Sequence, residues 1–144
     1  LVNTWQADSE GFYDVQRPDH GLEARGSFRT DEQGRLYFKS ILPVAYPVPT
    51  DGPVGDILRA SGRHPWRPAH IHFMIEAPGF RTLVTHIFRE EDQYLDSDVV
   101  FGVRSSLIAA MPLHAASETP PFGPVNAGQP FRTLDVNFRL VPTA

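Results

Sequence analysis

The sequence contains no cysteine. Disulfides, thiolate metal sites and cysteine nucleophiles are therefore excluded. It also has no block of basic residues, and its formal net charge is −4, which argues against a nucleic-acid partner held through phosphate contacts. No apolar run approaches the roughly 20 residues that a membrane helix requires. These absences favour a cytoplasmic protein that acts on a small molecule, with no nucleic-acid or membrane partner.

The chain has 144 residues, a length that fits one domain over residues 1–144. Its opening run, from Leu1 to Trp5, has neither an initiator methionine nor the charged and apolar regions of a signal peptide. This run is typical of the middle of a strand. We therefore expect the chain to be part of a longer protein.

Alternation of apolar and polar residues dominates the sequence and predicts β-structure. The 14 prolines and 11 glycines divide the chain into short elements. Strands are predicted at 24–30, 35–42, 70–75, 82–88 and 134–140, with turns at 31–34 and 77–80. Long loops are predicted at 43–68 and 112–130, whereas 98–111 fits either a helix or a turn followed by a strand. The expected fold is an all-β antiparallel sandwich with long loops and at most a short helix.

The run from Arg67 to Phe73, Arg-Pro-Ala-His-Ile-His-Phe, is the sharpest local motif. Residues two apart in a strand point to the same face, so His70 and His72 present two imidazoles side by side. Neutral imidazole is the commonest protein metal ligand. The alternative is two polar residues on the solvent-facing side of a strand, and His-x-His alone does not decide between them.

Further ligands for such a metal are scarce in the sequence. A site with two histidines and one carboxylate needs a nearby Asp or Glu, and Glu76 lies too far along the same strand. Two tyrosines, Tyr13 and Tyr46, stand in polar, turn-rich segments. Taken one at a time, each is better interpreted as a packed or surface aromatic residue.

Three segments together resemble the intradiol ring-cleaving dioxygenase family. The run from Trp5 to Gln16 resembles the segment that carries the first tyrosine of that family, and Ile41 to Pro49 resembles the second. The Arg67-to-Phe73 run resembles the histidine motif. The order and spacing agree, and the resemblance extends from Leu1 to about Val141.

The resemblance implies one non-haem Fe(III) ion per chain, bound by Tyr13, Tyr46, His70 and His72. The family splits catechols with dioxygen between the two hydroxyl-bearing carbons. Tyr46 matches the labile tyrosine, which leaves the metal and accepts a substrate proton. Arg67 matches the arginine that stabilises charge developing on the ring, a role that suits a permanently charged planar guanidinium. Without the adjacent motif, Arg67 would be interpreted as an ordinary surface ion pair.

Substrate preference within the family is indicated by a second group of residues. His86 stands where catechol-cleaving members usually have Gln, and the stretch from Tyr94 to Val103 is similar to hydroxyquinol 1,2-dioxygenases. These cleave benzene-1,2,4-triol toward maleylacetate. Val99 and Val100 match substrate-pocket positions, with core packing as the alternative. A catechol or chlorocatechol 1,2-dioxygenase is the alternative substrate assignment.

Two other classes remain open. The sandwich could be a non-catalytic transthyretin-like or carbohydrate-binding module, or a zinc or Fe(II) enzyme could use His70, His72 and His86. Members of the family that cleave catechols or hydroxyquinol carry an N-terminal helical region that mediates homodimerisation. Nothing in this sequence corresponds to that region, so we expect a piece that lacks it.

Strand register decides where His86 points. If 70–75 and 82–88 form a hairpin in which paired positions add to 158, His72 lies opposite His86 and both face the metal. A sum of 157 or 159 exchanges the faces and turns His86 away. The resemblance favours 158, with His86 near the substrate and not on the metal.

Overall fold

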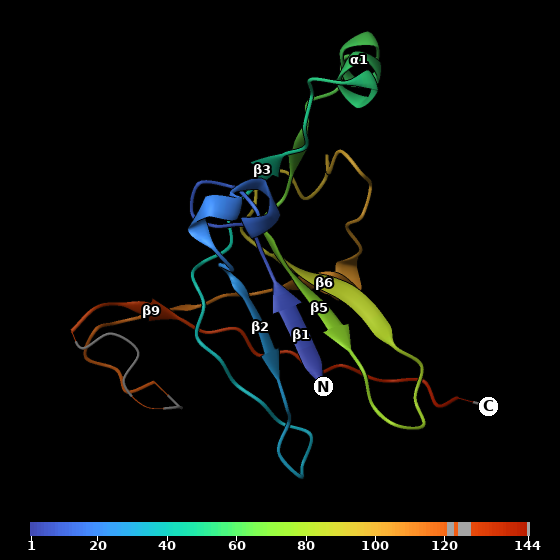
Figure 1. The fold of residues 1–144 in the computed structure, drawn as a ribbon. Helices are drawn as coiled ribbons and strands as arrows, with labels where there is room; N and C mark the ends of the chain where they lie inside the picture. Colours follow the sequence, from blue (N-terminus) through green and yellow to red (C-terminus); the bar gives the residue numbers. More distant parts are fainter. Residues whose placement is uncertain (121–122, 124–127, 144) are drawn as a thin grey trace.

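Residues 1–120, 123 and 128–143 are described by the structure, which is a computed structural model. Its main element is a five-stranded sheet in the order β2-β1-β5-β6-β7 (Figure 1). The strands are β1 (Val2–Trp5), β2 (Arg25–Phe28), β5 (His70–Ile75), β6 (Leu83–Arg89) and β7 (Ile108–Ala109). Neighbouring strands are antiparallel, except that β7 pairs with β6 in parallel.

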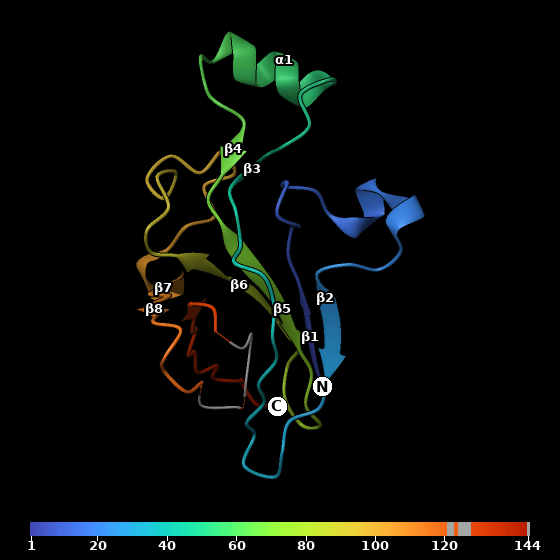
Figure 2. The same ribbon diagram turned by 90° about the vertical axis from the view of Figure 1, so that its left-hand side faces the viewer.

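Two short ribbons and one helix complete the fold. The ribbons pair β3 (Tyr46–Pro47) with β4 (Trp66–Arg67), and β8 (Leu113–His114) with β9 (Phe131–Arg132). Helix α1 (Pro53–Ala60) lies between β3 and β4 and stands away from the sheet at the top of Figure 2. Three 3-10 turns are η1 (Asp14–Gln16), η2 (Pro18–His20) and η3 (Ser105–Leu107).

The register of β5 against β6 is the one that adds to 158. His72 pairs with His86, and His70 pairs with Phe88. Trp5 of β1 pairs with His72 on its other side. Because directly opposed residues share a face, these side chains lie on one face of the sheet, as the sequence predicts.

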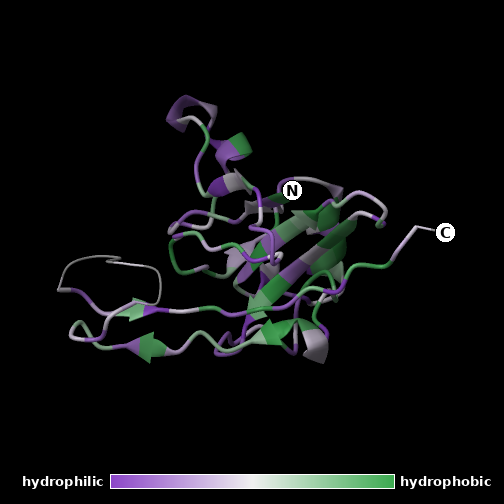
Figure 3. Ribbon diagram, turned by 90° about the horizontal axis from the view of Figure 1, so that it is seen from below, coloured by the Kyte–Doolittle hydropathy of each residue, from purple (hydrophilic) through white to green (hydrophobic). Residues whose placement is uncertain are grey.

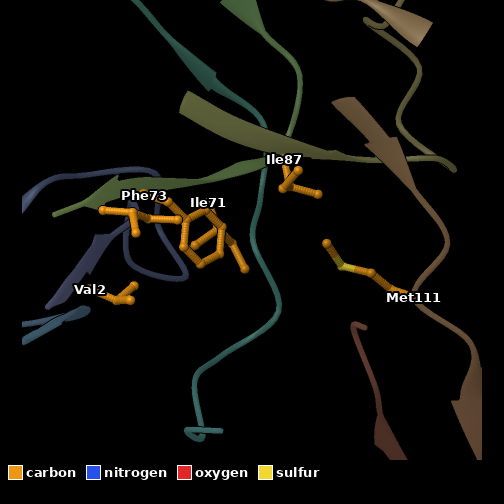
Figure 4. Close-up of a cluster of buried hydrophobic side chains, with 6 residues drawn as sticks. Val2, Ile71, Phe73, Ile87 and Met111 are labelled. Atoms are coloured by element: carbon orange, nitrogen blue, oxygen red, sulfur yellow. The ribbon is translucent and has the colours of Figure 1, made fainter. Parts of the chain in front are cut away.

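The opposite face of the sheet carries the core. Ile71, Phe73 and Ile87 are buried and lie in one cluster with Val2 and Met111 (Figure 4). Hydrophobic and hydrophilic residues alternate along the strands in Figure 3. At about 25 cal/mol per Å² of apolar surface, this face supplies the burial that fixes the register.

Two predicted strands, 35–42 and 134–140, form no ladder within the described residues. Their alternating apolar side chains nevertheless pack against the core from the side opposite the sheet, which completes the second layer of the sandwich. These side chains are Leu36, Phe38, Leu134, Val136, Phe138 and Leu140. The prediction that one side of each segment is buried is therefore confirmed, whereas the prediction that their backbones pair as strands is wrong.

Other segments differ from the predictions in detail. The predicted loop 43–68 contains the β3–β4 ribbon and α1. The segment 98–111 takes the second of its two predicted forms, a turn followed by the short strand β7. The predicted loop 112–130 contains β8, and its residues 121–122 and 124–127 lie outside the described part. In the part of the chain that the structure describes, no helix is both long and apolar enough to cross a membrane.

Candidate metal centre

The two histidines of β5 hold their rings on the face of the sheet away from the core. His70 is only 2% exposed, and its Nδ1 lies 2.6 Å from the carbonyl oxygen of Pro68. A carbonyl only accepts hydrogen bonds, so Nδ1 carries the proton and the lone pair lies on Nε2. His72 stacks on Trp5 of the neighbouring strand, with ring centroids 4.9 Å apart and planes 7° apart. Both rings are thereby fixed in orientation.

Tyr13 lies in the loop between β1 and η1. Hydrogen bonds made by polar residues of this segment stabilise its conformation. The carboxylate of Asp8 accepts the backbone N–H groups of Glu10 and Phe12 at 2.8 and 3.0 Å. Next to Tyr13, the buried carboxylate of Asp14 accepts two hydrogen bonds from Arg25 on β2. This two-pronged ion pair ties the loop to the sheet.

Tyr46 comes from β3, where it pairs with Arg67 of β4. Gly11 lets the Tyr13 loop approach Tyr46 closely, because a Cβ at Gly11 would lie 3.1 Å from the Tyr46 Cβ. Gly11 also has φ of +89°, a conformation that side chains disfavour. The sequence therefore brings the two tyrosines together through one glycine and one short ribbon.

Four side-chain atoms converge at the centre: Tyr13 Oη, Tyr46 Oη, His70 Nε2 and His72 Nε2. The two phenol oxygens lie 3.0 Å apart, and the two imidazole nitrogens lie 3.1 Å apart. His72 Nε2 is 3.2 Å from Tyr13 Oη, and His70 Nε2 is 3.5 Å from Tyr46 Oη. Ligands about 2.0–2.1 Å from one shared ion lie about 2.8–3.4 Å from each other. The spacing of the four atoms therefore fits a single ion.

The donor chemistry fits a metal ion as well. His70 and His72 point ring nitrogens at each other, and two lone pairs at that distance need a proton or a cation between them. Burial lowers the pKa of His70 to about 3, with the Arg67 and His72 charges adding to the effect. Burial and the His86 and Arg67 charges lower the pKa of His72 to about 4. The imidazoles are therefore neutral at pH 7, the form in which they bind metals.

The pKa of the Tyr13 phenol shifts upward, whereas those of the two imidazoles shift downward. Burial raises the pKa of Tyr13 well above its ordinary value, and the hydrogen bond with Tyr46 raises it further. The nearby Arg67 charge opposes this shift but does not cancel it, so without a bound metal ion Tyr13 stays protonated at pH 7. A bound metal ion of high charge reverses this preference and ionises a coordinating phenol.

Arg67 lies beside the four atoms and is held by a buried carboxylate. Its NH1 is 3.2 Å from His70 Nε2, while Nε and NH2 donate to Asp98 at 3.2 and 3.4 Å. Arg67 is 8% exposed and Asp98 is 3% exposed. Burial acts to raise the pKa of Asp98, but the hydrogen bonds from Arg67 and Gly102 outweigh it and lower that pKa. The interpretation of Arg67 as an ordinary surface ion pair is therefore wrong.

The other predicted site residues surround this group. His86 lies on the same face as His72, with ring centroids 5.6 Å apart, and its Nε2 is 3.5 Å from the Gly102 carbonyl oxygen. Val99 is buried, whereas Val100 is half exposed. Both follow Asp98 directly in the chain, on the turn that leads to Gly102.

Two neighbours of the centre were missed in the sequence. Asp98 stood within a run interpreted only as a family segment, and no local pattern marks it as the partner of Arg67. Trp5 stood within a predicted strand, and the Trp5–His72 pairing depends on a β1–β5 register that the sequence does not specify. One feature of the sequence could have indicated a structural role for Asp98: an aspartate that accepts backbone N–H groups two to four residues later is typical of a turn.

The geometry also tests the alternative in which His70, His72 and His86 bind zinc or Fe(II). His70, His72 and His86 share a face, but the His86 ring nitrogen is directed at a backbone carbonyl. Among the described residues, no three His, Cys, Asp or Glu side chains are placed to hold one metal ion. A zinc or Fe(II) site built on the three histidines is therefore not supported.

Comparison with known proteins finds that the chain is similar to dioxygenases. A family model described as a dioxygenase matches residues 1–142. The chain is 63% identical over 111 residues to a 6-chlorohydroxyquinol 1,2-dioxygenase of Cupriavidus pinatubonensis, covering 75% of this chain and 40% of that protein. It is 43% identical over 144 residues to a hydroxyquinol 1,2-dioxygenase of Corynebacterium glutamicum, covering 99% of this chain and 48% of that protein.

Solved structures agree with these relatives. A hydroxyquinol 1,2-dioxygenase from Pseudomonas putida DLL-E4 superimposes with a TM-score of 0.89 at 43% identity, over 99% of this chain and 50% of that chain. A catechol 1,2-dioxygenase from Pseudomonas arvilla C-1 gives 0.88 at 33% identity, over 98% of this chain and 46% of that chain. The chain thus spans half or less of the length of each of these proteins.

We predict that the metal-free protein loses stability as the pH falls below about 6.5. His70 and His72 have folded pKa values of about 3 and 4, against 6.5 as the ordinary value. Between these limits the unfolded chain binds more protons than the folded one, so the free energy of unfolding falls with the pH. The urea midpoint measured from pH 7.5 to 5 checks this. A double variant, His70→Gln with His72→Gln, should give a flatter profile, and an equally steep one would contradict the assignment.

Proposed function

This chain belongs to the intradiol dioxygenase family, and we propose that it is the catalytic domain of a hydroxyquinol 1,2-dioxygenase. Members of this family use non-haem Fe(III). The proposed reaction inserts both atoms of dioxygen into benzene-1,2,4-triol, cleaving between adjacent hydroxyl-bearing carbons toward maleylacetate. Catechol or chlorocatechol is the alternative substrate. The expected homodimer and the cytoplasmic location stay predictions.

One observation carries the proposal. Tyr13 Oη, Tyr46 Oη, His70 Nε2 and His72 Nε2 converge with contacts of 3.0 to 3.5 Å. We propose that these four atoms hold one Fe(III) ion per chain. A non-catalytic binding module has no use for two phenols and two imidazoles at one point, and the family assignment removes that alternative.

The proposed ligand set also suits the charge of the ion. Ionising a phenol of ordinary pKa near 10 at pH 7 costs about 4 kcal/mol, and burial makes Tyr13 harder still to ionise. An Fe(III) ion held by these residues would offset this cost, would lower the pKa of the substrate hydroxyls and would make the ring reactive toward dioxygen. Two phenolates in turn neutralise most of the ferric charge, which limits the cost of burying it.

The residues around the ion would divide the remaining work. Tyr46 is half-buried and pairs across the ribbon with the positively charged Arg67. Tyr46 is therefore suited to accept a substrate proton and return as a ligand. Arg67 directs NH1 toward the centre, where a fixed guanidinium stabilises negative charge developing on the ring. Tyr13, His70 and His72 would keep their positions throughout.

The substrate assignment rests on residues near this centre. The relatives named for hydroxyquinol or 6-chlorohydroxyquinol are 43–63% identical to the chain. His86 stands on the metal-facing side of β6 and can hydrogen-bond a third ring hydroxyl. Val99 and Val100 are proposed to line the pocket beside it, where small side chains leave room for that substituent.

The decisive test is loading the purified, metal-depleted protein with Fe(III). A broad visible absorption band from phenolate-to-iron charge transfer should appear at one ion per chain. With benzene-1,2,4-triol and ¹⁸O₂, the ring-opened diacid should gain both labelled atoms. A protein loaded with Zn(II) should be colourless and inactive. A colourless iron-loaded protein would refute the ligand assignment, and a coloured protein that cleaves no catechol would refute the activity alone.

We predict that Tyr13→Phe and Tyr46→Phe differ in kind. Each removes one phenolate and should shift the visible band. Tyr46→Phe should in addition slow substrate deprotonation, because the labile ligand serves as the base, so kcat should fall by about 10²- to 10⁴-fold. Steady-state kinetics and stopped-flow substrate binding measure the two steps. The exposed Tyr37→Phe is a matched control, and equal small losses in both site variants would contradict this division.

We predict that benzene-1,2,4-triol has a higher kcat/KM than catechol. We also predict that His86→Gln lowers the ratio of the two kcat/KM values, triol over catechol. Losing a hydrogen bond to the third hydroxyl costs about 0.5–1.5 kcal/mol, or about a 2- to 12-fold change in the ratio. Iron content should stay unchanged because His86 is not a ligand. Loss of iron in the variant would show that His86 is one, and an unchanged ratio would exclude it from substrate recognition.

A further inference from the structure

A single turn, residues 98–102, contacts both of the groups proposed to face the substrate. Asp98 accepts hydrogen bonds from Nε and NH2 of Arg67 at 3.2 and 3.4 Å. The same carboxylate accepts the backbone N–H of Gly102 at 2.8 Å and that of Val100 at 3.4 Å. The Gly102 carbonyl oxygen lies 3.5 Å from Nε2 of His86. Arg67 and His86 are thus linked through one carboxylate and four residues of backbone.

The turn has little freedom to change shape. Phe101 has φ of +56°, a left-handed conformation that is unusual for a bulky residue. A Cβ at Gly102 would lie 3.1 Å from Arg67 NH2 and 3.1 Å from Asp98 Oδ2. The Val99 backbone is also fixed, since its N–H donates to the Trp66 carbonyl at 3.1 Å. The Asp98 carboxylate is the group that joins this backbone to the guanidinium.

The direction of the guanidinium follows from which of its edges the carboxylate occupies. Asp98 takes Nε and NH2, so NH1 is left on the side of His70 Nε2, 3.2 Å away. A guanidinium only 8% exposed is costly to bury without a counter-charge. Within the described residues, Asp98 supplies the carboxylate that forms an ion pair with Arg67.

We propose that Asp98 is a positioning residue that fixes the Arg67 guanidinium with NH1 toward the reacting ring. This inference rests on the proposed dioxygenase activity. Asp98 itself touches neither the four converging atoms nor the space beside them. It acts through Arg67, and its contribution disappears when Arg67 is absent.

The test compares Asp98→Asn, Arg67→Gln and the double variant in the iron-loaded protein. Asparagine keeps the shape and one acceptor oxygen but loses the charge and the second acceptor. We expect Asp98→Asn to lower kcat by about 10- to 100-fold, the effect of misplacing a group by about 1 Å, with KM changed less than about threefold. In the Arg67→Gln background, Asp98→Asn should change kcat less than about twofold. Additive losses in the double variant would overturn the proposal.

Iron content, the visible band and the melting temperature separate positioning from general damage. Asp31→Asn is a matched control, because Asp31 also accepts two backbone N–H groups and an arginine side chain, in the remote turn 31–35. We expect the iron content and the visible band of Asp98→Asn to stay near those of the wild type. Its melting temperature should fall, because the buried Arg67 charge loses its counter-charge. A loss of iron or of the band would assign Asp98 to building the metal centre and would overturn the proposal.

A readout on metal-free protein keeps this inference separate from the proposed function. In a ¹⁵N–¹H spectrum, the Arg67 Nε–H resonance should exchange slowly with water in the wild type and quickly in Asp98→Asn. Rapid exchange in both proteins would overturn the positioning contact. Slow exchange in the wild type alone, with no ring cleavage by any iron-loaded form, would confirm the contact while refuting the dioxygenase activity through which Asp98 is proposed to act.

Discussion

The pairing of β5 with β6 is the constraint on which the rest of the structure depends. With side chains alternating at every residue, a single register sends Ile71, Phe73 and Ile87 into the core and His70 and His72 to the other face. A slip of one residue in β6 would expose Ile87 and bury His86. Burial of the apolar face therefore orients the histidines, although none of the residues of the buried cluster is among the four that converge at the centre.

Two segments distant in sequence then bring phenols to that face, and each is fixed by a different interaction. The Tyr13 loop is tied by the Asp14–Arg25 ion pair to β2, while Tyr46 is placed by its ribbon partner Arg67. The hydrophobic core does not reach these segments. The Tyr13 loop depends on charge-assisted hydrogen bonds, which are directional and stronger than neutral ones, and Tyr46 depends on backbone pairing. Directional bonds suit a centre whose four atoms must converge to within a few tenths of an ångström.

The sequence predicted those parts of the molecule that local chemistry determines. Two-residue periodicity predicted the hairpin, whereas the family resemblance favoured the register that puts His72 and His86 on a shared face. The same periodicity misassigned 35–42 and 134–140 as paired strands, because one-sided burial alternates whether or not the backbone pairs. Asp98 was missed for a different reason: its partner lies 31 residues away, and no pattern in a single sequence reports an ion pair made by chain folding.

Opposite pKa shifts keep three of the four converging side chains uncharged in the metal-free protein. Burial lowers the pKa of His70 and His72 and raises that of Tyr13, so imidazoles and phenol are all neutral near pH 7. A site of carboxylates would attract any divalent cation, because its charge is present beforehand. Here negative charge arises only when an ion displaces phenolic protons, and the free energy for that step grows with the charge of the ion. In the proposed centre, such a set of donors would discriminate by polarising power and would favour a trivalent ion over divalent ones.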